Sequence, residues 1–254
     1  MIVFIKNLIN NFLKKFNYQI VKKKNSIKII EANDCYLSLM NKVIKISVTS
    51  TERQWSLIQS LEYINNNEIE GNLVECGVFR GGNLILMNHI CNKLNLKKDI
   101  YAYDTFSGMT TPTDEDVEIE TNISANKIMN KTQKNKYKGN NIWCFATIEQ
   151  VKSNLSKEFK TFENIKFVKG PVEETLLNVN NLPDKISLLR LDTDFYSSTK
   201  IELEILYPRL VKGGILIIDD YGSWEGSRKA VDEYFKNENI WLHYIDKDSR
   251  LLIK

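Results

Sequence analysis

The sequence predicts an α/β fold, with helices on both faces of a doubly wound, mostly parallel sheet that ends in a C-terminal antiparallel hairpin. Short apolar runs rich in Val, Ile and Tyr recur along the chain, and helical stretches separate most of them. Alternation of strands and helices is typical of a parallel sheet covered on both faces. The expected strands are "NLVECGV" (72–78), "IYAYDTF" (100–106), "IKFVKG" (165–170), "ISLLRLD" (186–192) and "GGILIIDD" (213–220).

Helices and a hairpin are expected around these strands. The segment "TERQWSLIQSLEYINNN" (51–67) repeats its apolar residues at helical spacing, and so does "WEGSRKAVDEYF" (224–235) after the fifth strand. The final stretch, "IWLHYIDKDSRLLIK" (240–254), predicts two short strands that turn at residues 246–249. We therefore expect one main domain over residues 51–254, preceded by an N-terminal region, 1–50.

The N-terminal region begins with an amphipathic helix. In "MIVFIKNLINNFLKKF" apolar residues recur at helical spacing while lysines occupy the other face. This helix can pack on its own domain or on a second subunit, or it can adsorb to an anionic membrane with help from "KKK" at 22–24. It has neither the length to span a bilayer nor a secretory cleavage site. We expect a cytoplasmic protein, and peripheral contact with the inner membrane surface stays open.

Composition excludes several classes of protein. With 254 residues, 43% of them hydrophobic, the chain can bury the core of one large domain. A surplus of 35 Lys and Arg over 32 Asp and Glu is too small to indicate a nucleic-acid partner. The four cysteines are scattered, without the paired spacing that a zinc site needs.

Polar residues close each expected strand, where open parallel sheets bind their ligands. In "VECGVFRGGNL" a strand leads through glycine into a helix, but the dinucleotide pattern G-x-G-x-x-G is missing. Such a loop suits a ligand without a pyrophosphate, and Glu75 suits a cationic group on it. Asp104 ends the second strand, where folds of this class present an acid to a ribose diol.

Two adjacent strands end in aspartates, Asp192 on one and Asp219 with Asp220 on the other. A divalent cation removes the repulsion between them, and an all-oxygen ligand set indicates Mg²⁺, Mn²⁺ or Ca²⁺ rather than zinc. If the chain turns after Asp192, Asp194 can act as a general base toward a substrate hydroxyl. Alternatively, these acids cap helices or pair with basic residues such as Arg190, Arg228 or Lys200.

Five segments together carry a family resemblance: "TSTER", "LVECGVFRGG", "YAYDTFSGM", "LLRLDTDFYSST" and "LYPRLVKGGILIIDDYGSWEGSRKAVDEY". In this order and spacing, from Ser47 to the C-terminus, the sequence resembles the macrocin O-methyltransferase (TylF/MycF-like) family. These are class I S-adenosylmethionine-dependent enzymes with a Rossmann-like fold that methylate sugar hydroxyls. The resemblance implies S-adenosylmethionine and Mg²⁺ as cofactors, a sugar-containing acceptor, and self-association into a homo-oligomer.

The resemblance also implies a role for each matching residue. The loop from Glu75 to Gly81 holds the methionine portion of the cofactor and Asp104 its ribose. Thr147 and the Gly170-Pro171 turn lie on its adenine side, and Ser47 and Val48 approach it from the N-terminal segment. The full set of implied cofactor contacts is Ser47, Val48, Glu75, Cys76, Gly77, Val78, Phe79, Gly81, Asp104, Thr147, Gly170 and Pro171. The implied Mg²⁺ ligands are Asp192, Asp219 and Asp220, with Asp194 as the base.

Alternatives remain at this point. The polar segment 110–141 is long enough to act as a lid over substrate, or it is a plain flexible insertion. A strand that ends in D-x-D also suits a metal-dependent glycosyltransferase using a nucleotide-sugar, although the glycine loop and the Asp219-Asp220 pair argue against it. A catalytically silent membrane scaffold is a third reading, which the intact acids disfavour.

Overall fold

The computed structural model describes residues 13, 29–133, 136–137 and 141–254. The expected amphipathic helix at 1–16 lies outside the described residues apart from Leu13, and so does the "KKK" segment at 22–24. The chain divides into two units, residues 1–30 and residues 31–254. The second unit holds all the strands and helices described below.

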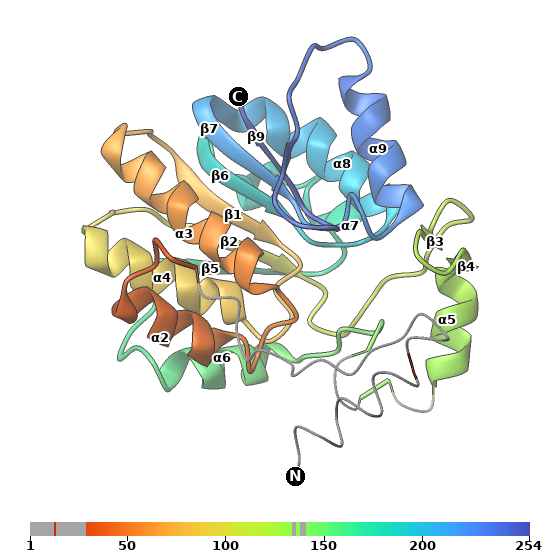
Figure 1. Ribbon diagram of the computed structural model, residues 1–254, viewed down its shortest axis with the longest axis horizontal. Helices are drawn as coiled ribbons and strands as arrows, with labels where there is room; N and C mark the ends of the chain where they lie inside the picture. Colours follow the sequence, from red (N-terminus) through yellow and green to blue (C-terminus); the bar gives the residue numbers. More distant parts are fainter. Residues whose placement is uncertain (1–12, 14–28, 134–135, 138–140) are drawn as a thin grey trace. The chain divides into compact units, whose positions relative to one another are not determined.

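A seven-stranded sheet forms the centre of this unit (Figure 1). Its strand order is β5-β2-β1-β6-β7-β9-β8, with the first five strands parallel and β9 antiparallel to both of its neighbours. The bounds are β1 Asn72–Cys76, β2 Ile100–Asp104, β5 Ile165–Lys169, β6 Ile186–Leu191, β7 Leu210–Ile218, β8 His243–Tyr244 and β9 Arg250–Ile253. The predicted doubly wound fold and its closing hairpin are thus confirmed.

Helices cover both faces of the sheet (Figure 1). One face carries α2 Asp34–Val43, α3 Thr51–Asn66, α4 Gly82–Leu94 and α6 Ile148–Ser156. The other carries α8 Tyr196–Leu206, which packs against both α7 Val172–Thr175 and α9 Glu225–Phe235. The helix α3 begins where the sequence predicts it, because the Ser50 side chain caps it by accepting a hydrogen bond from the Arg53 N–H.

The core lies along β6, and all six residues of this strand are buried. A parallel strand with helices on both faces buries both sets of side chains, so β6 reads as a continuous apolar run. Leu188 and Leu189 are fully buried, and each contributes about 1.5–3 kcal/mol relative to an exposed side chain. The exception within the strand is Arg190, a buried charge that needs carboxylate partners.

The strand order reverses beside β1, whose two neighbours are β2 and β6. The loops that leave β1 and β6 therefore run to opposite sides, and a crevice opens between them at the carboxyl edge. Asp192 N donates to the Cys76 carbonyl oxygen at 2.9 Å, which ties these two loops together. This edge is where the site residues converge.

The segment 110–141 carries structure of its own. It contains the short hairpin β3 Val117–Glu118 and β4 Ile123–Ser124, followed by α5 Ala125–Thr132. Ala125 and Met129 are buried against Phe195 and Trp224, which flank the acidic loops. The segment is thus docked over the carboxyl edge through its own apolar residues.

A buried carboxylate also anchors this segment. Asp116 Oδ2 accepts hydrogen bonds from the N–H and hydroxyl of Thr113, and Oδ1 accepts one from Tyr196 N, the first residue of α8, at 2.7 Å. Next to it lies Gly226 in the first turn of α9, where an added Cβ would be 2.0 Å from Asp116 Oδ1. The carboxylate therefore sits at the positive ends of two helices.

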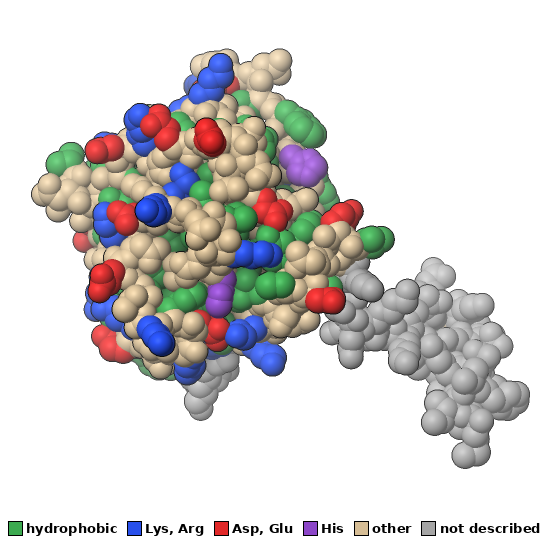
Figure 2. Space-filling view, turned by 90° about the vertical axis from the view of Figure 1, so that its left-hand side faces the viewer, with side chains coloured by type: hydrophobic (Ala, Val, Ile, Leu, Met, Phe, Trp, Pro, Cys, Tyr) green, Lys and Arg blue, Asp and Glu red, His purple; other side chains and the backbone are tan. Residues whose placement is uncertain are grey.

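The described surface is mixed in charge. Figure 2 shows Lys and Arg side chains interspersed with Asp and Glu over one face. Within the described part of the chain, no helix combines the length and the apolar character required to cross a bilayer.

Candidate active site

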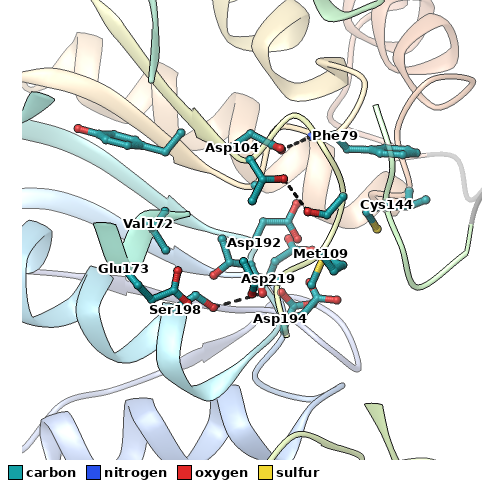
Figure 3. Close-up of a pocket in the computed structure, with 18 of the residues that line it drawn as sticks. Phe79, Asp104, Met109, Cys144, Val172, Glu173, Asp192, Asp194, Ser198 and Asp219 are labelled. Atoms are coloured by element: carbon teal, nitrogen blue, oxygen red, sulfur yellow. Dashed lines mark hydrogen bonds between the residues drawn. The ribbon is translucent and has the colours of Figure 1, made fainter. Parts of the chain in front are cut away.

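A pocket lies at the carboxyl edge of β1, β2, β6 and β7 (Figure 3). Its walls include Gly77, Asp104, Asp192, Asp219 and Asp220, each at or just after the end of its strand. Gly108, Met109, Thr110 and Cys144, which flank the docked segment, also line the pocket. The pocket is thus lined both by the strand-end acids and by residues that flank the segment 110–141.

The loop after β1 brings only some of its predicted cofactor residues to this pocket. Gly77 and Phe79 line it, together with Val48 from the stretch before α3. Glu75, Cys76, Val78 and Gly81 are not among the residues that line it. Glu75 is buried, and its Oε1 accepts a hydrogen bond from Arg190 Nη1 at 2.8 Å. Burial raises the pKa of Glu75 to about 7, although the ion pair with Arg190 opposes the shift.

Asp104 organises the same loop while it lines the pocket. Its Oδ2 accepts hydrogen bonds from Val78 N at 2.7 Å and Phe79 N at 3.0 Å, and its Oδ1 accepts one from Phe106 N (Figure 3). Burial raises the pKa of Asp104, and these backbone N–H groups counteract part of that rise. The acid that ends β2 therefore fixes the loop that ends β1.

The residues predicted on the adenine side are spread out, and so is Ser47, predicted to approach the cofactor from the N-terminal segment. Gly170 lines the pocket, and with Pro171 it also lines a shallower neighbouring groove formed by Thr105 and Gly108. Thr147 is the N-cap of α6, in a reciprocal capping box with Gln150. Ser47 accepts a hydrogen bond from Thr49 N. Neither Thr147 nor Ser47 is among the residues that line the pocket.

The acids that follow β6 and β7 lie close together, because the two strands are adjacent and parallel. One carboxylate oxygen from each of Asp192, Asp194 and Asp220 lies within 4.8 Å of the others. The strand β6 ends at Leu191 and Asp194 has φ 68°, so the chain turns here and Asp194 points back toward the group. Figure 3 shows Asp192, Asp194 and Asp219 grouped together among the side chains that line the pocket.

Burial raises the pKa of each of these three acids. For Asp194 burial and the neighbouring Asp192 raise it to about 7. Burial also raises the pKa of Asp192 and Asp220 well above the ordinary value, against the pull of nearby arginines.

Asp219 has a different environment from its neighbours. Its Oδ1 accepts a hydrogen bond from Arg190 Nη2 at 2.7 Å, and its Oδ2 accepts one from Arg53 Nη1 at 2.5 Å. Burial alone would raise the pKa of Asp219, but the two arginines outweigh it and lower the pKa. Of the predicted metal-ligand set, Asp192 and Asp220 therefore lie in the gathered group, while Asp219 is bound by arginines.

Sequence reasoning named Arg190 only as an alternative partner for the acids, and it overlooked Arg53. Arg190 is 1% exposed and contacts Glu75, Asp192 and Asp219 together. A charge inside a buried strand is a signal that could have placed it beside the strand-end acids. Arg53 carries no such local signal, because its partners lie far along the chain.

Comparisons with a family model and with known proteins all point to O-methyltransferases. The model of the macrocin O-methyltransferase (TylF) family matches residues 42–250. Demethyldecarbamoylnovobiocin O-methyltransferase of Streptomyces niveus is 30% identical over 200 residues, which are 78% of this chain and 71% of that protein. A tetracenomycin-C rhamnosyl 4'-O-methyltransferase of Streptomyces olivaceus is 28% identical over 189 residues, 74% of this chain and 67% of that protein.

Solved structures agree with this result. The structure of the O-methyltransferase NovP covers 82% of this chain and of its own chain, with 27% sequence identity and a TM-score of 0.69. The calicheamicin methyltransferase CalS11, at 18% identity and a TM-score of 0.58, shares the fold. The chain belongs to the macrocin O-methyltransferase (TylF) family of S-adenosylmethionine-dependent O-methyltransferases.

Proposed function

We propose that this protein transfers the methyl group of S-adenosylmethionine to a hydroxyl of a sugar-containing small molecule, with the help of Mg²⁺. The observation that carries the proposal is the gathering of strand-end aspartates in the same pocket as the glycine loop after β1. The rhamnosyl acceptor named for the Streptomyces olivaceus relative supports a sugar hydroxyl as the target.

The pocket residues suit the predicted cofactor. S-adenosylmethionine supplies an electrophilic methyl group on a sulfonium cation. Gly77, Gly108 and Gly170 line the pocket, and their φ angles of 86°, 96° and 137° give its walls turns that other residues adopt only with strain. Asp104 lines the pocket at the end of β2, where an acid can bind a ribose diol. The loop from Glu75 to Gly81 would hold the methionine portion.

The acid group suits a divalent cation. Among the described residues, salt bridges with Lys or Arg reach Asp219 twice and Asp192 once, whereas Asp194 and Asp220 form none. Because only one of the three gathered carboxylates has a basic partner, the group favours a hard cation with oxygen ligands. We assign Asp192, Asp219 and Asp220 as ligands, with Asp219 held in place by Arg190 and Arg53.

Asp194 is the proposed base. Bound Mg²⁺ would lower the pKa of the acceptor hydroxyl and offset the charge of the acids. The turn at Asp194 places its carboxylate among the ligands, within reach of a hydroxyl bound there. Asp194 accepts the hydroxyl proton, and the pocket holds the resulting oxygen in line with the methyl group.

The docked segment is the proposed lid. The pocket encloses about 150 Å³, which is below the roughly 300–1,000 Å³ of typical sites for ligands of this size. Four of the lining residues lie at or just outside the two ends of segment 110–141: Gly108, Met109, Thr110 and Cys144. We infer that these ends open to admit cofactor and acceptor, while the docked part forms the acceptor wall.

Calorimetric titration tests the proposal. Purified protein is titrated with S-adenosylmethionine and, separately, with nucleotide-sugars, each with and without Mg²⁺. The methyltransferase reading predicts saturable one-to-one binding of S-adenosylmethionine that needs no metal. Metal-dependent binding of a nucleotide-sugar alone would instead reassign Asp192 and Asp194 to diphosphate coordination, as in the glycosyltransferase alternative.

A further inference from the structure

Arg53, near the start of α3, binds three carboxylates from distant parts of the chain. Its Nη1 donates to Asp219 Oδ2 at 2.5 Å, its Nε to Asp246 Oδ2 at 2.8 Å, and its Nη2 to Asp248 Oδ2 at 2.5 Å. Ser50, the cap of the same helix, also donates to Asp246 Oδ2. One guanidinium thus joins α3, the end of β7 and the turn between β8 and β9.

This contact continues into the acid group. Asp219 also binds Arg190, and Arg190 in turn binds Asp192 at 2.7 Å. The side chains of Arg53, Asp219 and Arg190 are only 12%, 4% and 2% exposed, so water screens these pairs weakly. An unbroken series of ion pairs therefore runs from the turn at 246–248 through Arg53 to Asp192.

We propose that Arg53 is a positioning residue for the metal site, which it serves by fixing Asp219 and, through Arg190, Asp192. The inference rests on the proposed function. Asp220 directly follows Asp219, so the backbone that presents Asp220 is fixed by the same contacts. The planar, five-donor guanidinium can hold three carboxylates at once, whereas an ammonium is a point charge.

Charge and geometry act in opposite directions here, and the variants must separate them. A positive charge beside a cation site repels the cation, so removing the charge of Arg53 could tighten metal binding even as the ligands lose their order. The substitution Arg53→Lys keeps the charge and removes the fork. The substitution Asp248→Asn loosens Arg53 from its outer side and leaves Asp192, Asp219 and Asp220 in place.

The test measures Mn²⁺ binding to the full chain by calorimetry, with Mn²⁺ as the probe for the metal site, and S-adenosylmethionine binding in parallel. Partners that orient metal ligands commonly contribute 10–100-fold to affinity, so we expect Arg53→Lys to raise the Mn²⁺ Kd by about tenfold. Asp248→Asn should act in the same direction. The S-adenosylmethionine Kd should change less, by at most about threefold, because Asp104 holds the Val78 and Phe79 backbone of the cofactor loop through hydrogen bonds that do not involve Arg53.

Arg209→Lys is the matched control, since Arg209 directly precedes β7, at the end opposite Asp219, and donates to the Pro183 carbonyl oxygen. It should leave both affinities unchanged. The proposal is overturned if Arg53→Lys binds Mn²⁺ like the wild type, or if both ligands weaken together with a lower melting temperature. Absence of saturable Mn²⁺ binding by the wild type would instead overturn the metal in the proposed function.

Discussion

A Cβ atom added to Gly77 would lie 1.8 Å from the carbonyl oxygen of Asp192. The loop after β1 and the loop after β6 therefore touch backbone to backbone. Gly77 also has φ 86°, a conformation that other residues adopt only with strain. The cofactor loop and the acidic loop are thus built as one unit.

The substitution Gly77→Ala should disrupt this unit. We expect the S-adenosylmethionine affinity to fall by about tenfold or more, because the loop must shift and a shift of about 1 Å in a site has effects of this size. Calorimetry measures it. Gly71→Ala is the control, since Gly71 has φ 99° and close backbone neighbours at the opposite end of β1. It should destabilise the fold and spare cofactor affinity; equal loss in both variants would contradict the prediction.

Replacing Asp194 by Asn should abolish proton acceptance and leave the pocket intact. We expect methyl transfer to fall by about 10²–10⁴-fold, the usual contribution of a general base. Transfer of labelled methyl to an acceptor of the wild type measures this, and calorimetry should find S-adenosylmethionine binding retained. Asp184→Asn, at an exposed site before β6, should behave like the wild type. Turnover of the Asp194→Asn variant close to that of the wild type would remove Asp194 from the mechanism.

Asp116 should control how firmly the segment 110–141 is docked. The substitution Asp116→Ala leaves the donors of Thr113 and Tyr196 unpaired, which costs about 1–3 kcal/mol for a buried group. Trypsin should then cleave faster at Lys127 and Lys131 in α5. The exposed Asp114 provides the control, Asp114→Ala. The anchoring role fails if the two variants are cleaved at the same rate.

Glu75 should make stability depend on pH. Burial raises its pKa from 4.5 to about 7 in the folded protein, so between these values the unfolded chain releases a proton that the folded chain keeps. This contribution is complete below pH 4.5 and is lost as the pH rises through 7. We expect the free energy of unfolding of the wild type to fall by about 3 kcal/mol relative to Glu75→Gln between pH 4.5 and 8.

Denaturant titrations at pH 4.5, 6 and 8 measure that difference. The variant Glu75→Gln keeps an oxygen that can accept from Arg190 and cannot ionise. If the difference in free energy of unfolding between the wild type and Glu75→Gln is the same at all three pH values, Glu75 keeps its ordinary pKa.

Local patterns were sufficient to predict the parallel sheet. The five predicted strands match β1, β2, β5, β6 and β7, with β7 beginning three residues earlier, at Leu210 instead of residue 213. A strand buried on both faces leaves a continuous apolar run, and acids that end it must face the carboxyl edge. The convergence of Asp192 and Asp220 follows from the pairing of β6 with β7.

Contacts between residues far apart in the sequence could not be predicted from local sequence patterns. The docking of segment 110–141 depends on Asp116 meeting Tyr196, 80 residues later, and a polar stretch gives no sign of it. The environment of Asp219 depends on Arg53, 166 positions earlier. No periodicity encodes such pairs, because they depend on the packed arrangement of elements and on burial.

The most direct test of the account is a nuclear magnetic resonance measurement on S-adenosylmethionine with a ¹³C-labelled methyl group, bound to the wild type and to Asp220→Asn in the presence of Mn²⁺. Paramagnetic relaxation falls steeply with distance from the ion. If the acids and the glycine loop form one site, saturating Mn²⁺ should strongly broaden the methyl signal in the wild type, and the broadening should be lost in the variant. A sharp methyl signal in wild-type protein that has bound both ligands would contradict a shared pocket.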